Sequence, residues 1–203
     1  MKIAIIGATG QVGSRILAEA LRRGHTVTAI ARGAARKAAA AGVTAVSLDI
    51  TDSAALARAL AGNDAVVSAV RFISTPPEVL IKPIKAAGVK RWFIVGGAGS
   101  LEVAPGKALV DAPGFPELYK AEASAGRDFL NAIRGEQELE WTFLSPSAVL
   151  APGTRTGKFR VGADQLLTAP NGDSSISIED YAIAVIDELE NPRHIRQRFT
   201  VGY

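Results

Sequence analysis

A glycine-rich turn near the start of the chain constrains its fold more than any other feature. The run GATGQVG places Gly7, Gly10 and Gly13 at three-residue intervals. An apolar segment, residues 2–6, comes directly before it, and an amphipathic segment, residues 12–23, follows it. Glycines at this spacing between a strand and a helix predict a turn that binds a dinucleotide.

Each glycine has its own predicted role in such a turn. Gly7 permits the tight bend, Gly10 lets backbone N–H groups approach a pyrophosphate, and Gly13 lets the helix pack close to the strand. The positive end of the helix then faces the anion. A P-loop is excluded, because Ala8 and Ser14 stand where its first glycine and its lysine would be. The residues of this turn predicted to contact the dinucleotide are Gly7, Thr9, Gly10, Gln11, Val12 and Gly13.

The end of the second apolar segment indicates which dinucleotide the chain prefers. An acidic residue there binds the two ribose hydroxyls of NAD, but none occurs between Glu19 and Asp49. Arg32 occupies the position, with Arg36 or Lys37 one helical turn on, and a guanidinium suits a ribose 2′-phosphate. We therefore expect NADP(H) to be preferred over NAD(H). The alternative is that Arg32 is a solvated residue after a strand.

Apolar, β-branched segments recur along the chain and alternate with helix-like stretches. The segments are continuously apolar rather than alternating, which is typical of parallel strands covered on both faces. The sequence therefore predicts an α/β fold with a doubly wound, mostly parallel sheet, formed as a single domain over residues 1–203. The expected strands are 2–6, 26–31, 44–48, 65–70, 91–95, 141–144 and 197–201.

Two punctuated segments interrupt this rhythm. Residues 96–116 and 145–175 are rich in glycine and proline and are too long for ordinary connections, so we expect them to be irregular and to form the substrate side of the site. Helices are expected over 117–134 and 178–189. The alanine-rich stretch 34–41 is also expected to be helical.

Further contacts are expected at the carboxyl edge of the sheet, where such folds bind ligands. Asp49 could accept from an adenine amino group, whereas Asp52 in TDSAAL is expected to cap a helix. Small residues over 66–70 leave room for a nicotinamide ring. The additional predicted coenzyme contacts are Asp49, Ile50, Ser68, Ala69, Val70 and Arg71.

Composition excludes several other functions. The absence of cysteine excludes a disulfide, a thiolate nucleophile and a cysteine-ligated metal, and the distant His25 and His194 do not suggest zinc. The net charge of +3 is scattered, so no nucleic-acid partner is expected. No window reaches the roughly 18–20 apolar residues of a membrane span. Without a signal-peptide pattern, a cytoplasmic monomer or homodimer is expected.

Several longer segments resemble a known family. They are GATGQVGSRILAEALRRGHTVTAIAR, LDITD, GVKRWFIVGGAGSL, LEWTFLSPSAVL and ISIEDYAIAVIDELE. Together they resemble the atypical short-chain dehydrogenase/reductases, in particular the NADH-flavin reductase group related to biliverdin reductase B and NmrA-like proteins. The resemblance implies a Rossmann-like fold with a small C-terminal substrate-side region, NAD(P)H binding and, in some members, reduction of free flavin.

The chain departs from that family at its acid–base pair. Ordinary members carry Tyr-x-x-x-Lys on the helix after the fifth strand, but here Lys120 follows Tyr119 directly and Ala123 stands four residues after the tyrosine. Ser100, Tyr119 and Lys120 remain the candidate catalytic residues. Ser100 could instead form a turn, and Tyr119 could be an ordinary core aromatic residue with its hydroxyl at the surface.

Loss of the acid does not exclude hydride transfer. Reduction of a flavin places charge on a delocalised ring, so positioning in a dry site supplies most of the catalysis. We therefore expect an NADPH-dependent reductase of free flavin (FMN or FAD), as a substrate, or of a similar planar acceptor such as a quinone. The alternative is a non-catalytic, NmrA-like NADP(H) sensor; a nucleotide-sugar epimerase is disfavoured because its chemistry needs the dyad. The candidate stacking residues are Phe72, Ile73, Leu101, Val103, Leu109 and Phe115, with Arg71 as a possible phosphate contact.

Overall fold

A computed structural model describes residues 1–34 and 40–203 and shows an eight-stranded central sheet. Its strand order is β10-β12-β8-β5-β4-β1-β2-β3. Every neighbouring pair is parallel except β10 and β12, which are antiparallel. The strands are β1 (Lys2–Ile6), β2 (Thr26–Ile30), β3 (Val43–Val46), β4 (Ala65–Ser68), β5 (Arg91–Val95), β8 (Glu140–Pro146), β10 (Arg160–Gly162) and β12 (Gln197–Gly202).

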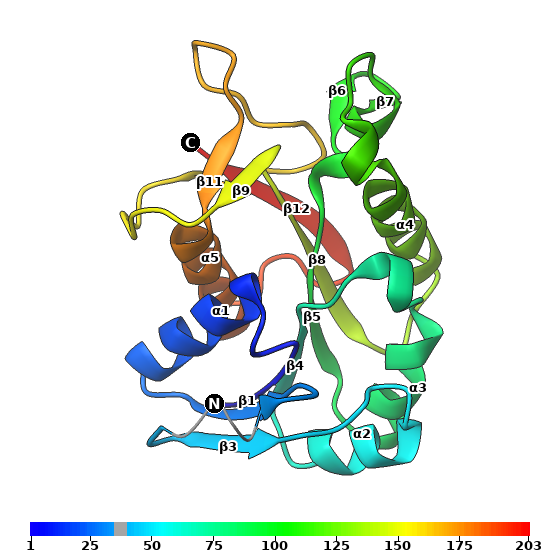
Figure 1. Cartoon of the computed structure of the whole chain (residues 1–203), viewed down its shortest axis with the longest axis vertical. Helices are drawn as coiled ribbons and strands as arrows, with labels where there is room; N and C mark the ends of the chain where they lie inside the picture. The colour runs from blue at the N-terminus through cyan, green and yellow to red at the C-terminus, as the bar shows by residue number, and fades with distance from the viewer. Residues whose placement is uncertain (35–39) are drawn as a thin grey trace.

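Helices cover both faces of this sheet (Figure 1). One face packs on α1 (Gln11–Arg22) and α5 (Ile178–Glu190). The other packs on α2 (Ser53–Leu60), α3 (Glu78–Ala86) and α4 (Glu117–Ile133). Strand β1 supplies Ile3 and Ile5 to the first core and Ala4 and Ile6 to the second, which is why its sequence is continuously apolar.

The two segments expected to be irregular contain short ordered elements. Residues 96–116 hold the 3-10 turns η3 (Ala98–Ser100) and η4 (Leu109–Asp111) and the hairpin of β6 (Glu102–Ala104) and β7 (Lys107–Ala108). In the second segment, β9 (Val149–Ala151) pairs in parallel with β11 (Ser175–Ser177), and β10 joins the main sheet. The prediction of irregular structure was therefore wrong for these short strands.

The order of the strands in the sheet reverses between β1 and β4. Strands β2 and β3 lie on one side of β1, whereas β4, β5, β8 and β12 lie on the other. This is the doubly wound, Rossmann-like arrangement, so the predicted fold class is confirmed. Ligands of such sheets bind outside the carboxyl ends of the strands at that reversal.

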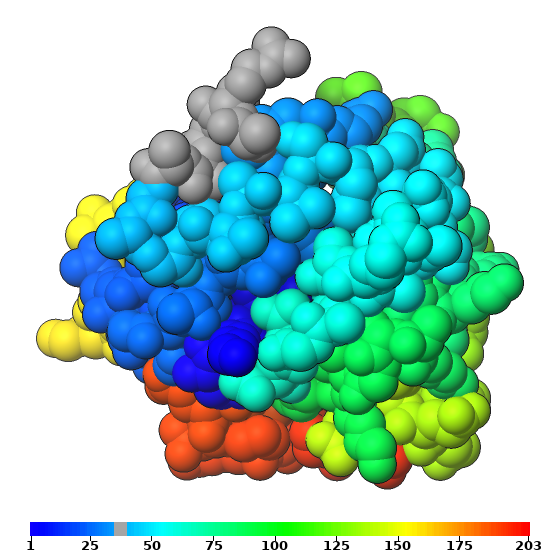
Figure 2. All heavy atoms as spheres, turned by 90° about the horizontal axis from the view of Figure 1, so that it is seen from below, coloured from blue at the N-terminus to red at the C-terminus, as the bar shows by residue number. Residues whose placement is uncertain are grey.

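The opposite, amino edge of the sheet carries no predicted site residue. Seen from below, the N-terminal segment in dark blue lies beside the orange-red end of α5 (Figure 2). His25 joins the two, because its ring nitrogens lie 3.2 Å from the N-terminal amine of Met1 and 2.9 Å from the carboxylate of Glu190. The helix expected over 34–41 lies largely outside the described residues, as do Arg36 and Lys37. Within the described ranges, no helix is long and apolar enough to cross a membrane.

Candidate active site

The first glycine of the turn lies where the sheet reverses direction. Gly7 has a φ of +84°, and a Cβ there would lie 2.2 Å from the carbonyl oxygen of Ala69. Its N–H donates to the carbonyl of Ile30 at 2.9 Å. The turn is therefore held between the ends of β2 and β4, and glycine alone fits it.

Gly13 fixes the helix against this turn. A Cβ on Gly13 would lie 2.2 Å from the carbonyl oxygen of Gly7, so α1 packs directly on backbone. The N-cap residue, Gly10, provides no side-chain cap, and the first turn of α1 contains no acidic residue. The first N–H groups of α1 are thus open to an anion, as the sequence predicted.

These N–H groups border a cavity of about 880 Å³. The ends of β4 and β5, the start of α4 and both substrate-side segments form its other walls, and most lining side chains are apolar. Its volume lies within the range of small-molecule binding sites. The lining residues are Gly10, Gln11, Val12, Ala69, Val70, Arg71, Phe72, Val95, Gly96, Gly97, Ala98, Gly99, Leu109, Ala112, Pro113, Gly114, Phe115, Pro116, Tyr119, Glu122, Ala123, Ala148, Val149 and Leu150.

Many of the predicted contacts meet in this cavity. Gln11 and Val12 come from α1, Val70 and Phe72 follow β4, and Phe115 precedes α4. The remaining members shared with the prediction are Gly10, Ala69, Arg71, Leu109 and Tyr119. Gly7, Thr9 and Gly13 belong to the turn behind this wall.

The structure places two predicted contacts away from the cavity. Ser68 is 2% exposed, and its hydroxyl accepts a hydrogen bond from Trp92 Nε1 at 3.0 Å. Leu101 is completely buried. Neither side chain lines the cavity, because the sequence pattern does not say toward which side of the backbone each side chain points. Among the other candidate stacking residues, Ile73 is exposed, and Val103 lines a separate hollow beside β6.

The three candidate catalytic residues are not brought together. The hydroxyl of Ser100 accepts from Arg198 at 3.3 Å and does not line the cavity. Lys120 points to its neighbour on the helix surface, Glu117, at 3.6 Å. Tyr119 does line the cavity and is 61% exposed, so it is not a core aromatic residue. Neither Ser100 nor Lys120 supplies an acid or base to the cavity.

The residues proposed for the adenosine half lie beyond β2 and β3. Arg32 is exposed just after β2. Asp49 accepts from the N–H and hydroxyl of Thr51, and these bonds, with a smaller contribution from Arg32, lower the pKa of Asp49. Ile50 packs against the core on the α2 side. Asp52 caps α2 by accepting from the N–H of Ala55 at 2.9 Å, which confirms its predicted role.

Sequence reasoning missed Glu122, which organises the cavity wall after β4. Its carboxylate accepts from the N–H of Phe72 at 2.7 Å and of Ile73 at 3.3 Å. It also lies 3.5 Å from Nε of Arg71. Its place one helical turn after Tyr119 was a visible signal, but its partners stand about fifty positions earlier in the chain. Also missed were Ala148, Val149 and Leu150.

A second missed residue, Arg198, holds the two substrate-side segments together. Its side chain is 4% exposed and reaches Asp164 at 2.5 Å. It also donates to the hydroxyls of Ser100 at 3.3 Å and Ser145 at 3.4 Å. Next to it, the N–H of Glu102 donates to the carbonyl of Asp164 at 2.8 Å. Arg198 therefore fixes the loop that carries one wall of the cavity.

Residues 153–157 are fastened to α1 and α5 by three carboxylates. Arg155 binds the buried Glu19 through two hydrogen bonds, of 2.9 and 2.8 Å. The Arg155 hydrogen bond lowers the pKa of Glu19, against the opposing effect of burial. Asp180 accepts from Thr156, and Glu179 accepts from the N–H of Gly153. We call residues 153–157 the strap.

The fold and this site define a class: the chain belongs to the NAD(P)H-binding family, whose sequence model matches residues 7–192. This family agrees with the NAD(P)H binding that the resemblance implied. The open helix N-terminus and the backbone cradle at Gly7 and Gly13 fit such a coenzyme.

Three solved structures are close to this chain. A candidate exported protein from Burkholderia pseudomallei is 50% identical over the full length of both chains, with a TM-score of 0.92. A candidate epimerase from Bacteroides thetaiotaomicron is 42% identical over all of this chain and 96% of its own, with a TM-score of 0.94. SP1627 from Streptococcus pneumoniae, a candidate NADH-flavin reductase, is 36% identical over all of this chain and 99% of its own, with a TM-score of 0.84.

Proposed function

We propose that the protein is an NADPH-dependent reductase of a planar acceptor, either free FMN or FAD or a quinone. The observation that carries the proposal is an apolar cavity of about 880 Å³ beside the glycine turn, in which none of the described lining residues is a lysine or a histidine. Such a site positions two rings but lacks the proton-donating dyad of a carbonyl reductase. The similar chain SP1627 is a candidate NADH-flavin reductase, which supports the same type of reaction for this protein.

The coenzyme side consists of the glycine turn, the first N–H groups of α1 and Arg32. When bound, NADPH would supply the hydride. The N–H groups from Gln11 to Gly13 would hold its pyrophosphate, and Arg32 would recognise the 2′-phosphate. The exposed guanidinium after β2 and the absence of an acidic residue there support the preference for NADPH.

The acceptor side consists of the substrate-side segments 96–116 and 145–175. Its apolar residues would exclude water and stack on the acceptor. In the cavity wall after β4, the side chain of Phe72 is firmly fixed, because its ring packs on Phe129 and Phe143 at centroid distances of 5.0 and 5.9 Å. Phe115 and Leu109, from residues 96–116, line the same cavity. Holding two rings at reacting distance can supply much of the rate enhancement.

Arg71 and Glu122 are the charged residues of the cavity wall, and they lie 3.5 Å apart. With Glu122 engaged by the backbone N–H of Phe72, Arg71 is the group available to an acceptor or coenzyme phosphate. Tyr119 would contribute a ring face rather than a proton.

The proposal is tested by mixing the purified protein with NADPH and FMN, riboflavin or menadione and following the absorbance of the reduced nicotinamide. We expect NADPH to be oxidised faster than in buffer with at least one acceptor. The rate with Tyr119→Phe should stay within about threefold of the wild-type rate, because no acid is required. No acceleration with any acceptor would contradict the proposal. If binding of NADP⁺ and NADPH were then equally tight, the non-catalytic sensor would be the better account.

The similarity to a candidate epimerase makes a second assay useful. Epimerisation in this superfamily is expected to need both the tyrosine and the lysine, and here Lys120 lies on the helix surface, paired with Glu117. We therefore expect no turnover of nucleotide sugars in the presence of NAD or NADP.

A further inference from the structure

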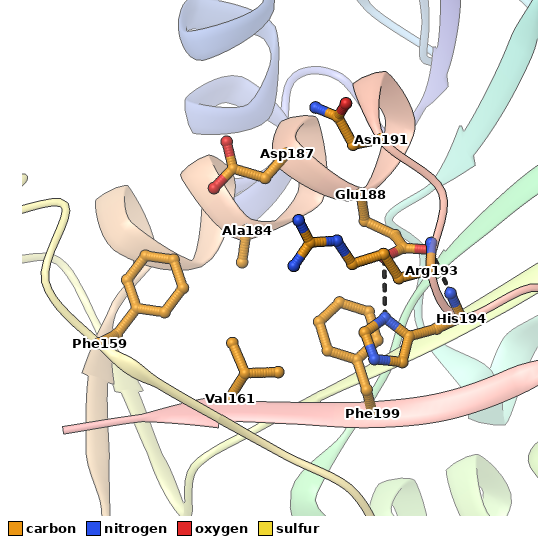
Figure 3. A pocket seen from close by; sticks show the side chains of 9 residues that line it. All are labelled: Phe159, Val161, Ala184, Asp187, Glu188, Asn191, Arg193, His194 and Phe199. Atoms are coloured by element: carbon orange, nitrogen blue, oxygen red, sulfur yellow. Dashed lines mark hydrogen bonds and ion pairs between the residues drawn. The ribbon is translucent and has the colours of Figure 1, made fainter.

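A second hollow, of about 380 Å³, lies between the C-terminal half of α5 and β12 (Figure 3). It shares no lining residue with the large cavity. The strap is held by the first turn of α5, whereas this hollow is formed along the other end of the same helix. We call it the α5–β12 pocket. Its lining residues are Phe159, Val161, Ala184, Asp187, Glu188, Asn191, Arg193, His194 and Phe199.

One side of the α5–β12 pocket is apolar. Phe159, Val161 and Ala184 border an open space in Figure 3, and the ring of Phe199 lies beside that of His194. The rings of Phe199 and His194 are stacked, with centroids 4.2 Å apart and planes 10° apart. The volume lies at the lower end of the range for small-molecule sites, so a single ring or a branched hydrocarbon would fill it.

The two carboxylates that line the pocket, Asp187 and Glu188, both have cationic partners. Glu188 is 4% exposed and accepts from the N–H of Arg193 at 2.9 Å and from Nδ1 of His194 at 2.8 Å. The guanidinium of Arg91 lies 3.4 Å from the same carboxylate. Asp187 is paired with Arg23 at 2.7 Å. Each acid is therefore already paired with a cation, although Arg23 is shared by Asp187, Glu19 and Glu190.

The polar groups that remain include the N–H donors of Arg193 and Asn191. Among the described residues, no partner is present for the guanidinium of Arg193, the side-chain amide of Asn191 or Nε2 of His194. Figure 3 shows the Arg193 side chain extending over the space between α5 and β12, and the second ring nitrogen of His194 turned away from Glu188. The guanidinium of Arg193 is therefore the charged group of the pocket that has no partner among the described residues.

We propose that the α5–β12 pocket binds a small organic carboxylate with an aromatic or branched apolar body. The carboxylate would bind the fork of Arg193, whose two N–H groups match its two oxygens, with Asn191 as a second donor. The apolar body would cover Phe159, Val161 and Phe199. This site is separate from the coenzyme and acceptor site and does not depend on the reaction proposed there.

The test uses benzoate as a probe and the ¹⁵N-labelled protein saturated with NADP⁺. We expect benzoate to shift the backbone amide resonances of residues 187–199 in a saturable way. Benzamide, which is neutral and of the same shape, should bind at least about tenfold more weakly. Arg193→Gln should weaken benzoate binding by at least about tenfold. The matched control Arg134→Gln, on an exposed arginine at the end of α4, should leave it unchanged.

Arg193 is exposed, so its substitution is not expected to affect folding. Absence of a saturable shift with benzoate, equal binding of benzamide, or an unaltered affinity in Arg193→Gln would each overturn the proposal. Because no acceptor is present and turnover is not measured, such a result would leave the proposed reductase activity untouched.

Discussion

The proposed coenzyme side and the proposed acceptor side of the cavity are built by different means. The coenzyme side depends on backbone contacts between near neighbours, such as that of Gly13 with Gly7. The acceptor side depends on side chains far apart in sequence, such as Arg155 with Glu19 and Arg198 with Asp164. Backbone contacts leave no room for substitution, whereas side-chain contacts can be exchanged one at a time. Substitutions on the two sides should therefore differ in how much they disturb.

The largest effect is expected from Gly13→Val on the coenzyme side. A Cβ at this position would lie 2.2 Å from a backbone oxygen that no rotamer change can move. We expect NADPH binding to be lost and the free energy of unfolding to fall by about 3 kcal/mol or more. Calorimetric titration and chemical denaturation measure the two effects. Gly135→Ala, whose nearest neighbour would lie at 3.7 Å, serves as the control. Wild-type affinity in Gly13→Val would contradict the backbone account of this side.

The next effect concerns the one side-chain contact proposed for the coenzyme side. Arg32→Ala should weaken the binding of NADPH roughly ten- to a hundredfold, which is the effect of losing a charge-assisted hydrogen bond. The affinity for NADH should stay unchanged. Fluorescence titration with both coenzymes measures the change, with Arg134→Ala as the control. Equal losses for the two coenzymes would mean that Arg32 does not recognise the 2′-phosphate.

On the acceptor side, Asp180→Asn tests the strap. Burial disfavours the ionised form of Asp180, but hydrogen bonds from Thr156, Gly157 and Tyr203 outweigh it and hold the pKa of Asp180 below its usual 3.8. Because the folded-state pKa is lower than the unfolded one, the stabilisation is complete near neutral pH and is lost as pH falls below about 4.

Asp180→Asn should therefore lower the free energy of unfolding at pH 7 by about 1–2 kcal/mol. The difference in the free energy of unfolding between Asp180→Asn and wild type should become smaller as the pH is lowered from 5 toward 2. Urea unfolding across this range is the measurement. A difference that stays constant with pH would show that the ionised carboxylate is not what holds the strap.

The smallest effect is expected from Arg198→Met, which loosens the loop without touching the glycine turn. The KM for the acceptor should rise about five- to tenfold, since small displacements of a positioning group have effects of this order or larger. The Kd for NADPH should stay within about twofold of wild type. Arg198→Lys, which can still reach Asp164, should be intermediate.

The matched control for Arg198 is Lys107→Met, an exposed cation on β7 of the same segment. Steady-state kinetics with the acceptor, combined with coenzyme titration, separates the two sides. A parallel loss of coenzyme affinity would show that the two sides are not independent.

The part of the molecule that sequence reasoning predicted well is the part whose structure is local. Strands β1 and β5 begin and end where the apolar segments do, and the glycine turn adopts the predicted geometry. These features depend on residues a few positions apart, so their spacing is visible in the sequence.

The acceptor side could not be predicted to the same depth. Ser100 looked catalytic, but its hydroxyl meets Arg198, which stands 98 positions later in the chain. Glu122 reaches backbone N–H groups 50 positions earlier. Burial of Leu101 and Ser68 is decided by the side of the backbone on which each lies. Pairings of this kind arise from the folded topology and leave no periodic signal.

The most direct test of the central claim is a calorimetric titration of the wild-type protein with NADPH and, separately, with NADH. The account predicts saturable binding of one NADPH per chain, at least about tenfold tighter than NADH because of the contact with Arg32. Absence of heat and of thermal protection with both coenzymes would contradict it.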